Sequence, residues 1–99
     1  MADFEWDPVK EALNLQNHYV NFTTASLIWD HPVLERPDNR RDYGESRFVA
    51  FGAVENRILA VVFTWRGEAR RIISARKANP RERRLFEEEI RRRGRSLPD

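Results

Sequence analysis

Basic side chains bracket a short apolar segment in the second half of the chain. Residues 72–75 (IISA) have the composition of a buried β-strand, and they are preceded by Arg70 and Arg71 and followed by Arg76 and Lys77. A guanidinium group binds phosphate oxygens through two parallel N–H donors and stacks on nucleobases. As a set, these side chains therefore indicate a phosphate-binding surface built on a strand. For any single arginine, a side chain that extends from a strand end into water is the alternative.

The basic residues are distributed unevenly along the chain. Sixteen of the 18 are arginine; residues 1–56 contain 5 basic and 10 acidic side chains, and residues 57–99 contain 13 and 6, so the balances of −5 and +7 sum to +2. A basic half of this kind favours a polyanionic partner such as nucleic acid. An arginine-rich but merely solvated surface is the alternative.

Several other chemistries find no support in the residue pattern. The chain has no cysteine, which excludes disulfides, thiolate nucleophiles and cysteine zinc sites. His18 and His31 stand 13 residues apart without an HExxH motif, so we expect no metal and no cofactor. The scattered glycines form no phosphate-binding loop, and no serine lies in a GxSxG motif. No basic leader or apolar run of about 18 residues is present, so we expect a soluble, cytoplasmic protein without membrane contact.

Cap residues and hydrophobic periodicity predict the elements of the first half. A chain of 99 residues is expected to form one domain over residues 1–99. Phe4–Trp6 suits an edge strand, and Asp7 followed by Pro8 starts a helix that runs to about His18. A second helix begins after the cap Asn21 and ends at residues 31–32 (HP), and residues 35–46 form the longest loop.

Three strands and a last helix are predicted for the second half. The strands are Arg47–Gly52, Arg57–Arg66 and Arg70–Arg76, with residues 53–56 as the first turn. The middle strand is apolar on both faces, so it should be central. The last helix starts at Asn79-Pro80 with a capping box from Glu82 and ends near Gly94. The element order predicts an α+β domain with two N-terminal helices, an antiparallel meander and a C-terminal helix. Regular alternation places Arg71 and Lys77 on one face of the third strand and Arg70 and Arg76 on the other.

The sequence resembles the BrnT family of toxins from type II toxin–antitoxin systems over about residues 4–89. The matching positions are FEWDP at 4–8, RIISARKA at 71–78, Lys10, Asn14, His18, Val20, Phe22, Ala25, Asp30, Glu45, Arg47, Gly52, Leu59, Val61 and RER at 81–83. Three positions depart from the family pattern: Asn17 replaces a lysine, Tyr19 a glycine and Phe86 a tyrosine.

The resemblance implies a RelE-like fold and a metal-independent endoribonuclease that inhibits translation. It also implies a BrnA-like antitoxin with a ribbon-helix-helix domain, through which alone the complex would contact operator DNA. RNA carries its own nucleophile, the 2′-OH, so the protein must orient it, stabilise charge on the phosphate and move protons.

On this basis the candidate site has two parts. His18, Arg76 and Lys77 are the predicted catalytic residues, and Arg66, Arg70, Arg71 and Arg81 the predicted substrate-binding residues. A non-catalytic module that binds RNA or protein through the same surface is the alternative function. A DNA-binding repressor is less favoured, because no helix-turn-helix pattern is present.

Overall fold

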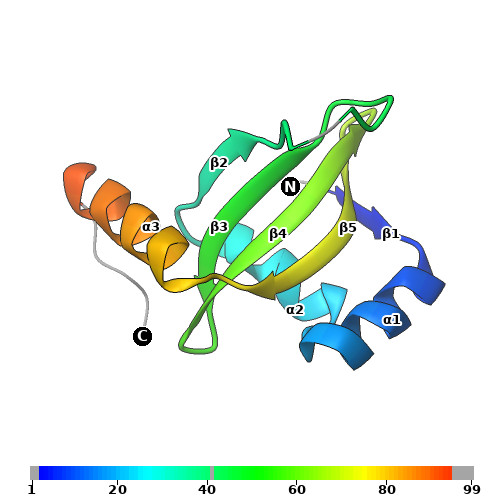
Figure 1. Ribbon diagram of the computed structural model, residues 1–99, viewed down its shortest axis with the longest axis horizontal. Coiled ribbons are helices and arrows are strands. Elements are labelled where there is room, and N and C mark those ends of the chain that lie inside the picture. The colour runs from blue at the N-terminus through cyan, green and yellow to red at the C-terminus, as the bar shows by residue number, and fades with distance from the viewer. Residues whose placement is uncertain (1–2, 41, 95–99) are drawn as a thin grey trace.

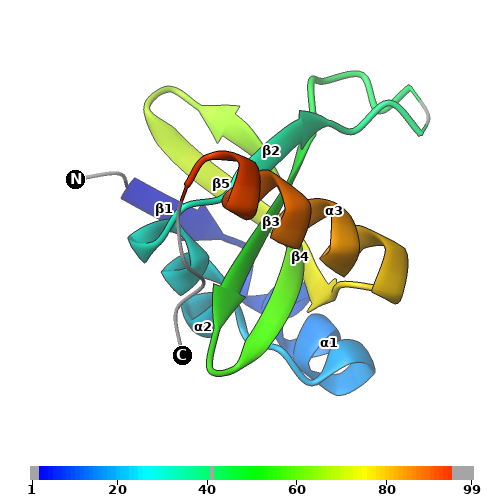
Figure 2. The same cartoon turned by 90° about the vertical axis from the view of Figure 1, so that its left-hand side faces the viewer.

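A five-stranded sheet separates two hydrophobic clusters in the computed structural model, which describes residues 3–40 and 42–94 (Figure 1). The elements in chain order are β1 (Asp3–Trp6), α1 (Pro8–His18), α2 (Phe22–Ser26), the 3₁₀ helix η1 (Leu27–Asp30), β2 (Leu34–Pro37), β3 (Phe48–Val54), β4 (Arg57–Arg66), β5 (Ala69–Lys77) and α3 (Pro80–Arg92). Helices α2 and α3 lie on opposite sides of the sheet, as the view turned by 90° shows (Figure 2).

The helices begin at the predicted cap residues. The side chain of Asp7 accepts a hydrogen bond from the backbone N–H of Val9, and that of Asn21 accepts one from Thr24. At α3 the capping box with Asn79 is complete. The second predicted helix is α-helical only in its first part. Helix α2 ends after five residues, and the chain continues as the 3₁₀ helix η1.

The sheet has the order β1-β5-β4-β3-β2. Strands β2 to β5 pair antiparallel in chain order, whereas β1 runs parallel to β5 at one edge, so the sheet is mixed. Strand β2 overlaps the start of the segment 35–46 that was expected to be loop. Strand β3 extends to Val54 because the hairpin turn needs only Glu55 and Asn56. Both turn residues have positive φ (54° and 62°), the conformation of a tight two-residue hairpin.

A β-bulge in β5 changes which side chains share a face. Phe63 pairs with Ile72 and Val62 with Ser74, so Ile73 is an extra residue in β5. Regular alternation predicted opposite faces for Arg71 and Arg76, and this was wrong. The additional residue resets the alternation and turns both arginines to the side of α3, while Arg70 and Lys77 share the other side.

The central strand was predicted with its observed bounds, and Val61 and Phe63 are fully buried in it. They pack against Phe22 of α2 and Ile28 of η1, and Gly52 is required there because an added Cβ would lie 2.6 Å from the Cβ of Ile28. On the other side, α3 buries Phe86 and Ile90. The described part of this helix covers one end of its sheet face, and a pocket opens on the remainder.

Candidate nucleic-acid interface

Arginines from four parts of the chain meet on the sheet side that carries α3. Register places Arg66 and Arg71 on this side at the far ends of β4 and β5, and Arg76 nearer to α3. Arg36 of β2 pairs with Val49 and shares its face, and Arg40 follows that strand. We call these five residues the arginine face.

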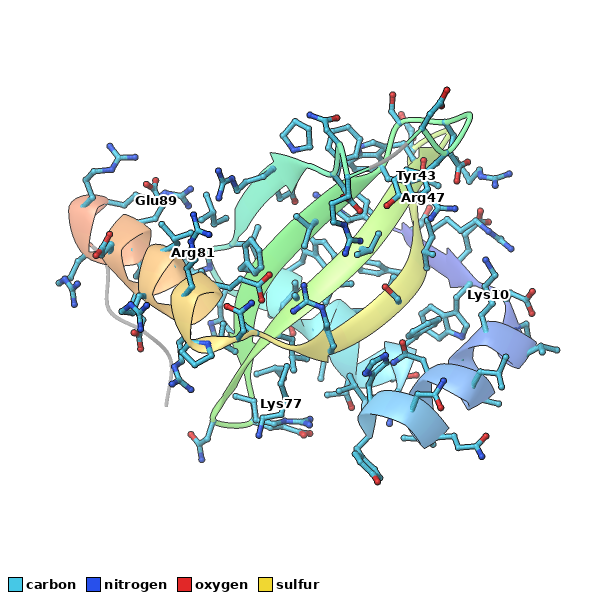
Figure 3. All side chains as sticks on the ribbon, in the orientation of Figure 1. Lys10, Tyr43, Arg47, Lys77, Arg81 and Glu89 are labelled. Carbon is cyan, nitrogen blue, oxygen red and sulfur yellow. The ribbon has the colours of Figure 1, made fainter. Side chains whose placement is uncertain are left out.

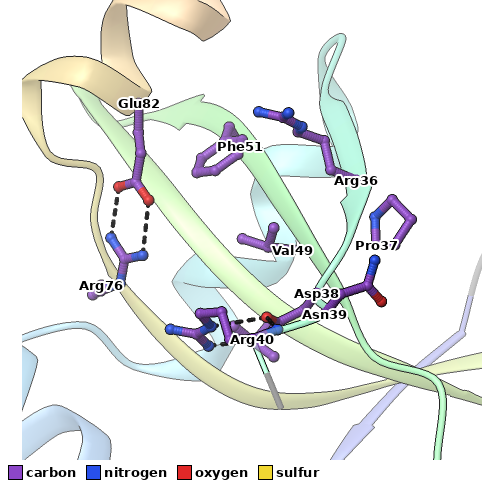
Figure 4. Close-up of a pocket in the computed structure, with 10 residues that line it drawn as sticks. Arg36, Pro37, Asp38, Asn39, Arg40, Val49, Phe51, Arg76 and Glu82 are labelled. Carbon is purple, nitrogen blue, oxygen red and sulfur yellow. Dashed lines mark hydrogen bonds and ion pairs between the residues drawn. The ribbon is translucent and has the colours of Figure 1, made fainter. Parts of the chain in front are cut away.

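A pocket of about 230 Å³ lies in the arginine face, between β2, β3 and the start of α3. Its floor is apolar and consists of Val49, Phe51 and Val62. In Figure 4, Arg76 and Arg40 flank the hollow. The arrangement offers a hydrophobic surface next to cationic donors, the combination that a nucleotide requires.

The guanidinium of Arg76 is held by a carboxylate. Its two terminal nitrogens donate to the oxygens of Glu82 at 2.7 and 2.9 Å, and the same carboxylate caps α3 by accepting from the N–H of Asn79. The hydrogen bonds between Arg76 and Glu82 shift both pKa values. They hold the pKa of Glu82 below its ordinary value of 4.5 and raise the pKa of Arg76. Arg76 is therefore a permanently charged, oriented cation that donates hydrogen bonds but does not act as a general acid.

Arg40 is held in the same way on the other side of the pocket. Its Nε and Nη2 atoms donate to Asp38 at 2.8 and 2.9 Å, and the Asp38 side chain is only 3% exposed. The hydrogen bonds from Arg40 lower the pKa of Asp38, so the carboxylate stays ionised. The positive charge of Arg40 also opposes the rise in the pKa of Arg76, as expected for two cations on one pocket.

The outer members of the arginine face make longer contacts. Arg66 lies 3.7 Å from Glu45 with 54% of its side chain exposed, and Arg71 lies 3.5 Å from Glu5. Arg81 is exposed on the first turn of α3, outside the arginine face (Figure 3). Arg66 and Arg81 are exposed and Arg71 is partly exposed, so all three guanidinium groups are accessible to phosphates.

Arg70 occupies a different environment from the other predicted substrate-binding residues. Its guanidinium carbon lies 4.7 Å from the ring centre of Trp29 and 4.6 Å from that of Trp65, and it pairs with Glu35 at 3.2 Å. Only 15% of the side chain is exposed, and its buried Nε has no hydrogen-bond partner. The structure thus separates Arg70 from the arginine face and stacks it on Trp29 and Trp65.

The predicted catalytic residues do not converge on one point: Arg76 and Lys77 are consecutive in β5 and face opposite sides of the sheet, and His18 ends α1. Asn14 of α1 bonds the backbone of Ala75, and His18 follows one turn later on the same side of that helix, exposed. Arg76 turns toward α3, and Lys77 is exposed on the other side of β5 (Figure 3).

Sequence reasoning missed the residues of β2 and of the segment that follows it. Arg36, Asp38 and Arg40 fall in the segment expected to be loop, and their position at the pocket follows from the pairing of β2 with β3. Tyr43 also lies in this segment, with the guanidinium of Arg47 stacked 4.1 Å from its ring centre. A local signal was present in the Asp-Asn-Arg spacing, which permits a short carboxylate–guanidinium pair, but it does not indicate a pocket.

Two further observations concern the part of the chain that the structure describes. Within it, no three His, Asp or Glu side chains are grouped as metal ligands would be. No helix there is long and apolar enough to cross a membrane.

Comparison with known proteins gives a match to one family and matches to solved structures. The sequence profile of a family described as "Ribonuclease toxin, BrnT, of type II toxin-antitoxin system" matches residues 6–82. Among solved structures, the fold is similar to the 1.1 Å crystal structure of the Brucella abortus ribonuclease toxin BrnT. The TM-score is 0.59 at 24% identity, over 80% of this chain and 99% of that chain. A search of functionally curated proteins found no match.

Proposed function

Because this chain belongs to the BrnT family of ribonuclease toxins of type II toxin–antitoxin systems, we propose that its arginine face binds single-stranded RNA for cleavage. The reaction would be metal-independent and would use the 2′-OH of the RNA as nucleophile. Membership of the family implies an RNA target and an antitoxin partner. We further propose that the chain acts as one RelE-like toxin domain in the cytoplasm, where cleavage inhibits translation.

The observation that carries this proposal is the gathering of five arginines on one sheet face. The bulge at Ile73 supports it most directly, because Arg71 and Arg76 would otherwise face opposite sides of β5. Arg71 and Arg76 lie opposite Thr64 and Ala60 of β4, so with the bulge they are separated by roughly 13 Å, the length of four regular positions at ~3.3 Å each. That distance suits two separate, non-adjacent phosphates of an extended RNA strand better than a single phosphate.

Each arginine then has a defined task. Arg76, oriented by Glu82, stabilises the charge that develops on the scissile phosphate. Arg66 and Arg71 hold flanking phosphates, and Arg81 contacts the RNA at the first turn of α3. Arg70 has a structural task in this scheme, since its guanidinium is stacked between Trp side chains on the other face.

Proton transfer is assigned to His18, with Lys77 as the second candidate. Histidine is the side chain whose unperturbed pKa lies close to neutrality, which suits general acid–base catalysis. The hydrogen bonds between Asn14 and Ala75 support the assignment, because they hold α1, which ends at His18, against the strand that carries Arg76 and Lys77.

For the partner, we propose a BrnA-like antitoxin with a ribbon-helix-helix domain. Binding over the arginine face would block RNA, and the complex would contact operator DNA through the antitoxin alone. The net positive balance of residues 57–99 supports an acidic antitoxin segment as the covering element.

The experiment is cleavage of bare single-stranded RNA in EDTA by the wild type and by two double variants of equal charge. Arg71→Gln/Arg76→Gln removes two members of the arginine face, whereas Arg84→Gln/Arg91→Gln removes two exposed arginines of α3. We expect cleavage by the wild type and the α3 variant, and at least a ~10²-fold slower reaction for the first variant. RNA that is retained but not cleaved by the wild type would instead favour a non-catalytic binding module.

A further inference from the structure

The pocket in the arginine face is larger than a site for one ion. Its volume of about 230 Å³ is roughly eight times the ~30 Å³ that one water molecule occupies in the liquid. The floor contains an aromatic ring, Phe51, between Val49 and Val62, and Figure 4 shows Phe51 and Val49 in the middle of the hollow. An apolar floor of this kind accommodates a planar ring rather than a hydrated ion.

The walls of the pocket supply donors for an anion. Three arginines and two carboxylates line it, so the formal charge is 3 − 2 = +1. Each carboxylate is already bound by an arginine, Asp38 by Arg40 and Glu82 by Arg76. A guanidinium has five N–H donors and its carboxylate uses two, so both arginines retain donors for a second acceptor.

We propose that this pocket seats one unstacked nucleotide of the RNA, with the base on the Phe51 floor and a phosphate between Arg40 and Arg76. The proposal rests on the RNA-binding function above and adds to it a place where the protein contacts a base. Single-stranded RNA is recognised mainly through bases that leave the stack and settle on aromatic and arginine side chains. One surplus positive charge matches the single charge of a phosphodiester.

The paired carboxylates have a task in this arrangement. An unpaired arginine side chain is flexible, and ordering it on binding would cost conformational entropy. Asp38, buried to 3% exposure, and Glu82, fixed by the cap of α3, hold the two guanidinium groups in place before RNA arrives. The pocket is thus preorganised for its ligand.

The test uses a short RNA in which every 2′-OH is methylated, so that it binds without being cleaved. A series of such oligonucleotides, each lacking one base, is titrated by fluorescence anisotropy. We expect one position at which loss of the base weakens binding roughly tenfold, the size of one base–aromatic stack. This sensitivity to one base should disappear in the variant Arg40→Gln, which replaces an exposed side chain. It should persist in the matched control Arg84→Gln, which replaces an exposed arginine on the outer side of α3.

A second measurement needs no variant. The methyl resonances of Val49 and Val62 in the wild-type chain should shift with the intact oligonucleotide and not with the one that lacks the sensitive base. Equal effects of all abasic positions, or unmoved methyl groups, would overturn the nucleotide assignment. Methyl groups that respond to the antitoxin but not to RNA would also overturn it and make the pocket a protein-binding site.

The outcomes separate this inference from the proposed nuclease. If the wild type cleaves unmethylated RNA but no base position matters, the pocket assignment fails and the nuclease stands. If one base matters and its binding shifts the two valine methyl groups, but unmethylated RNA stays intact, the pocket stands and the nuclease assignment fails.

Discussion

Asn14 of α1 pairs with the backbone of Ala75 in β5 as a neighbouring strand would. The backbone N–H of Ala75 donates to Oδ1 of Asn14 at 3.0 Å, and Nδ2 of Asn14 donates to the carbonyl oxygen of Ala75 at 2.8 Å. The register between β1 and β5 ends at Ile72, so this amide continues the edge of the sheet beyond β1. Nδ2 also donates to the carbonyl of Val20 and closes the turn after the helix that carries His18.

Replacement of Asn14 by Asp should therefore destabilise the fold. The substitution removes the donor to two carbonyl oxygens and puts a carboxylate in a site that is 7% exposed. We expect a loss of about 2–4 kcal/mol in the free energy of unfolding, measured by urea denaturation. The same change at exposed Asn17, near the end of α1, should cost less than about 1 kcal/mol. Equal losses in the two variants would contradict the role given to the Asn14 amide.

His18 should affect the chemical step and not RNA binding. Single-turnover cleavage by His18→Ala is expected to slow by about 10²–10⁴-fold, with the RNA affinity little changed. His31→Ala provides the matched control, because His31 is exposed at the end of η1 and should retain the wild-type rate. A wild-type rate in folded His18→Ala would move proton transfer to another group, with Lys77 tested next.

Arg71 and Arg70, neighbours in sequence, should respond differently to substitution. Arg71→Gln is expected to lower the slope of log K against log salt for RNA binding by about 0.7 to 1, as loss of one phosphate contact does. Arg70→Gln should leave that slope unchanged and lower the free energy of unfolding by about 1–3 kcal/mol, since it removes a stacked and ion-paired guanidinium. A reduced salt slope for Arg70→Gln would instead assign that arginine to the RNA.

The Arg76–Glu82 pair should contribute to stability above mildly acidic pH. Because hydrogen bonds from Arg76 lower the pKa of Glu82 in the folded chain, its contribution is present above the ordinary value of 4.5. It is lost as the pH falls through the lower folded-state pKa. Glu82→Gln should cost about 1–3 kcal/mol near pH 7 and progressively less below about pH 4.5, as measured by urea denaturation at each pH.

The control for Glu82→Gln is Glu88→Gln, which removes an exposed carboxylate from the same helix and so changes the charge of α3 by the same amount. If the cost of Glu82→Gln stays constant down to about pH 2, the stabilising interaction at this site does not depend on the ionised carboxylate.

The antitoxin should shield the arginine face. In the complex we expect Arg66, Arg71 and Arg76 to be protected from an arginine-specific reagent such as phenylglyoxal, with Arg84 modified as in the free chain. Co-expression of the antitoxin should also relieve any growth arrest caused by the toxin. Full reactivity of the three arginines in the complex would mean that inhibition acts elsewhere on the chain.

Local chemistry made several features predictable from sequence. Asp7, Asn21 and Asn79 start helices because their side chains accept hydrogen bonds from N–H groups two or three residues ahead. The strand Arg57–Arg66 was predicted with its observed bounds, since residues apolar on both faces require a central position. The arginines that bracket residues 72–75 were likewise visible as a candidate phosphate-binding set.

Pairing between distant segments decided the rest. Strand β2 has no periodic pattern of its own and becomes a strand through its hydrogen bonds to β3. That pairing positions Arg36 and Arg40 at the pocket. The bulge at Ile73 arises from the register between β4 and β5. That register depends on both strands, so it cannot be predicted from residues 70–77 alone. The sequence by itself therefore determined which side chains were available for binding phosphate. Only the tertiary structure decided which of them share a face, because one extra residue in a strand reverses every side chain that follows it.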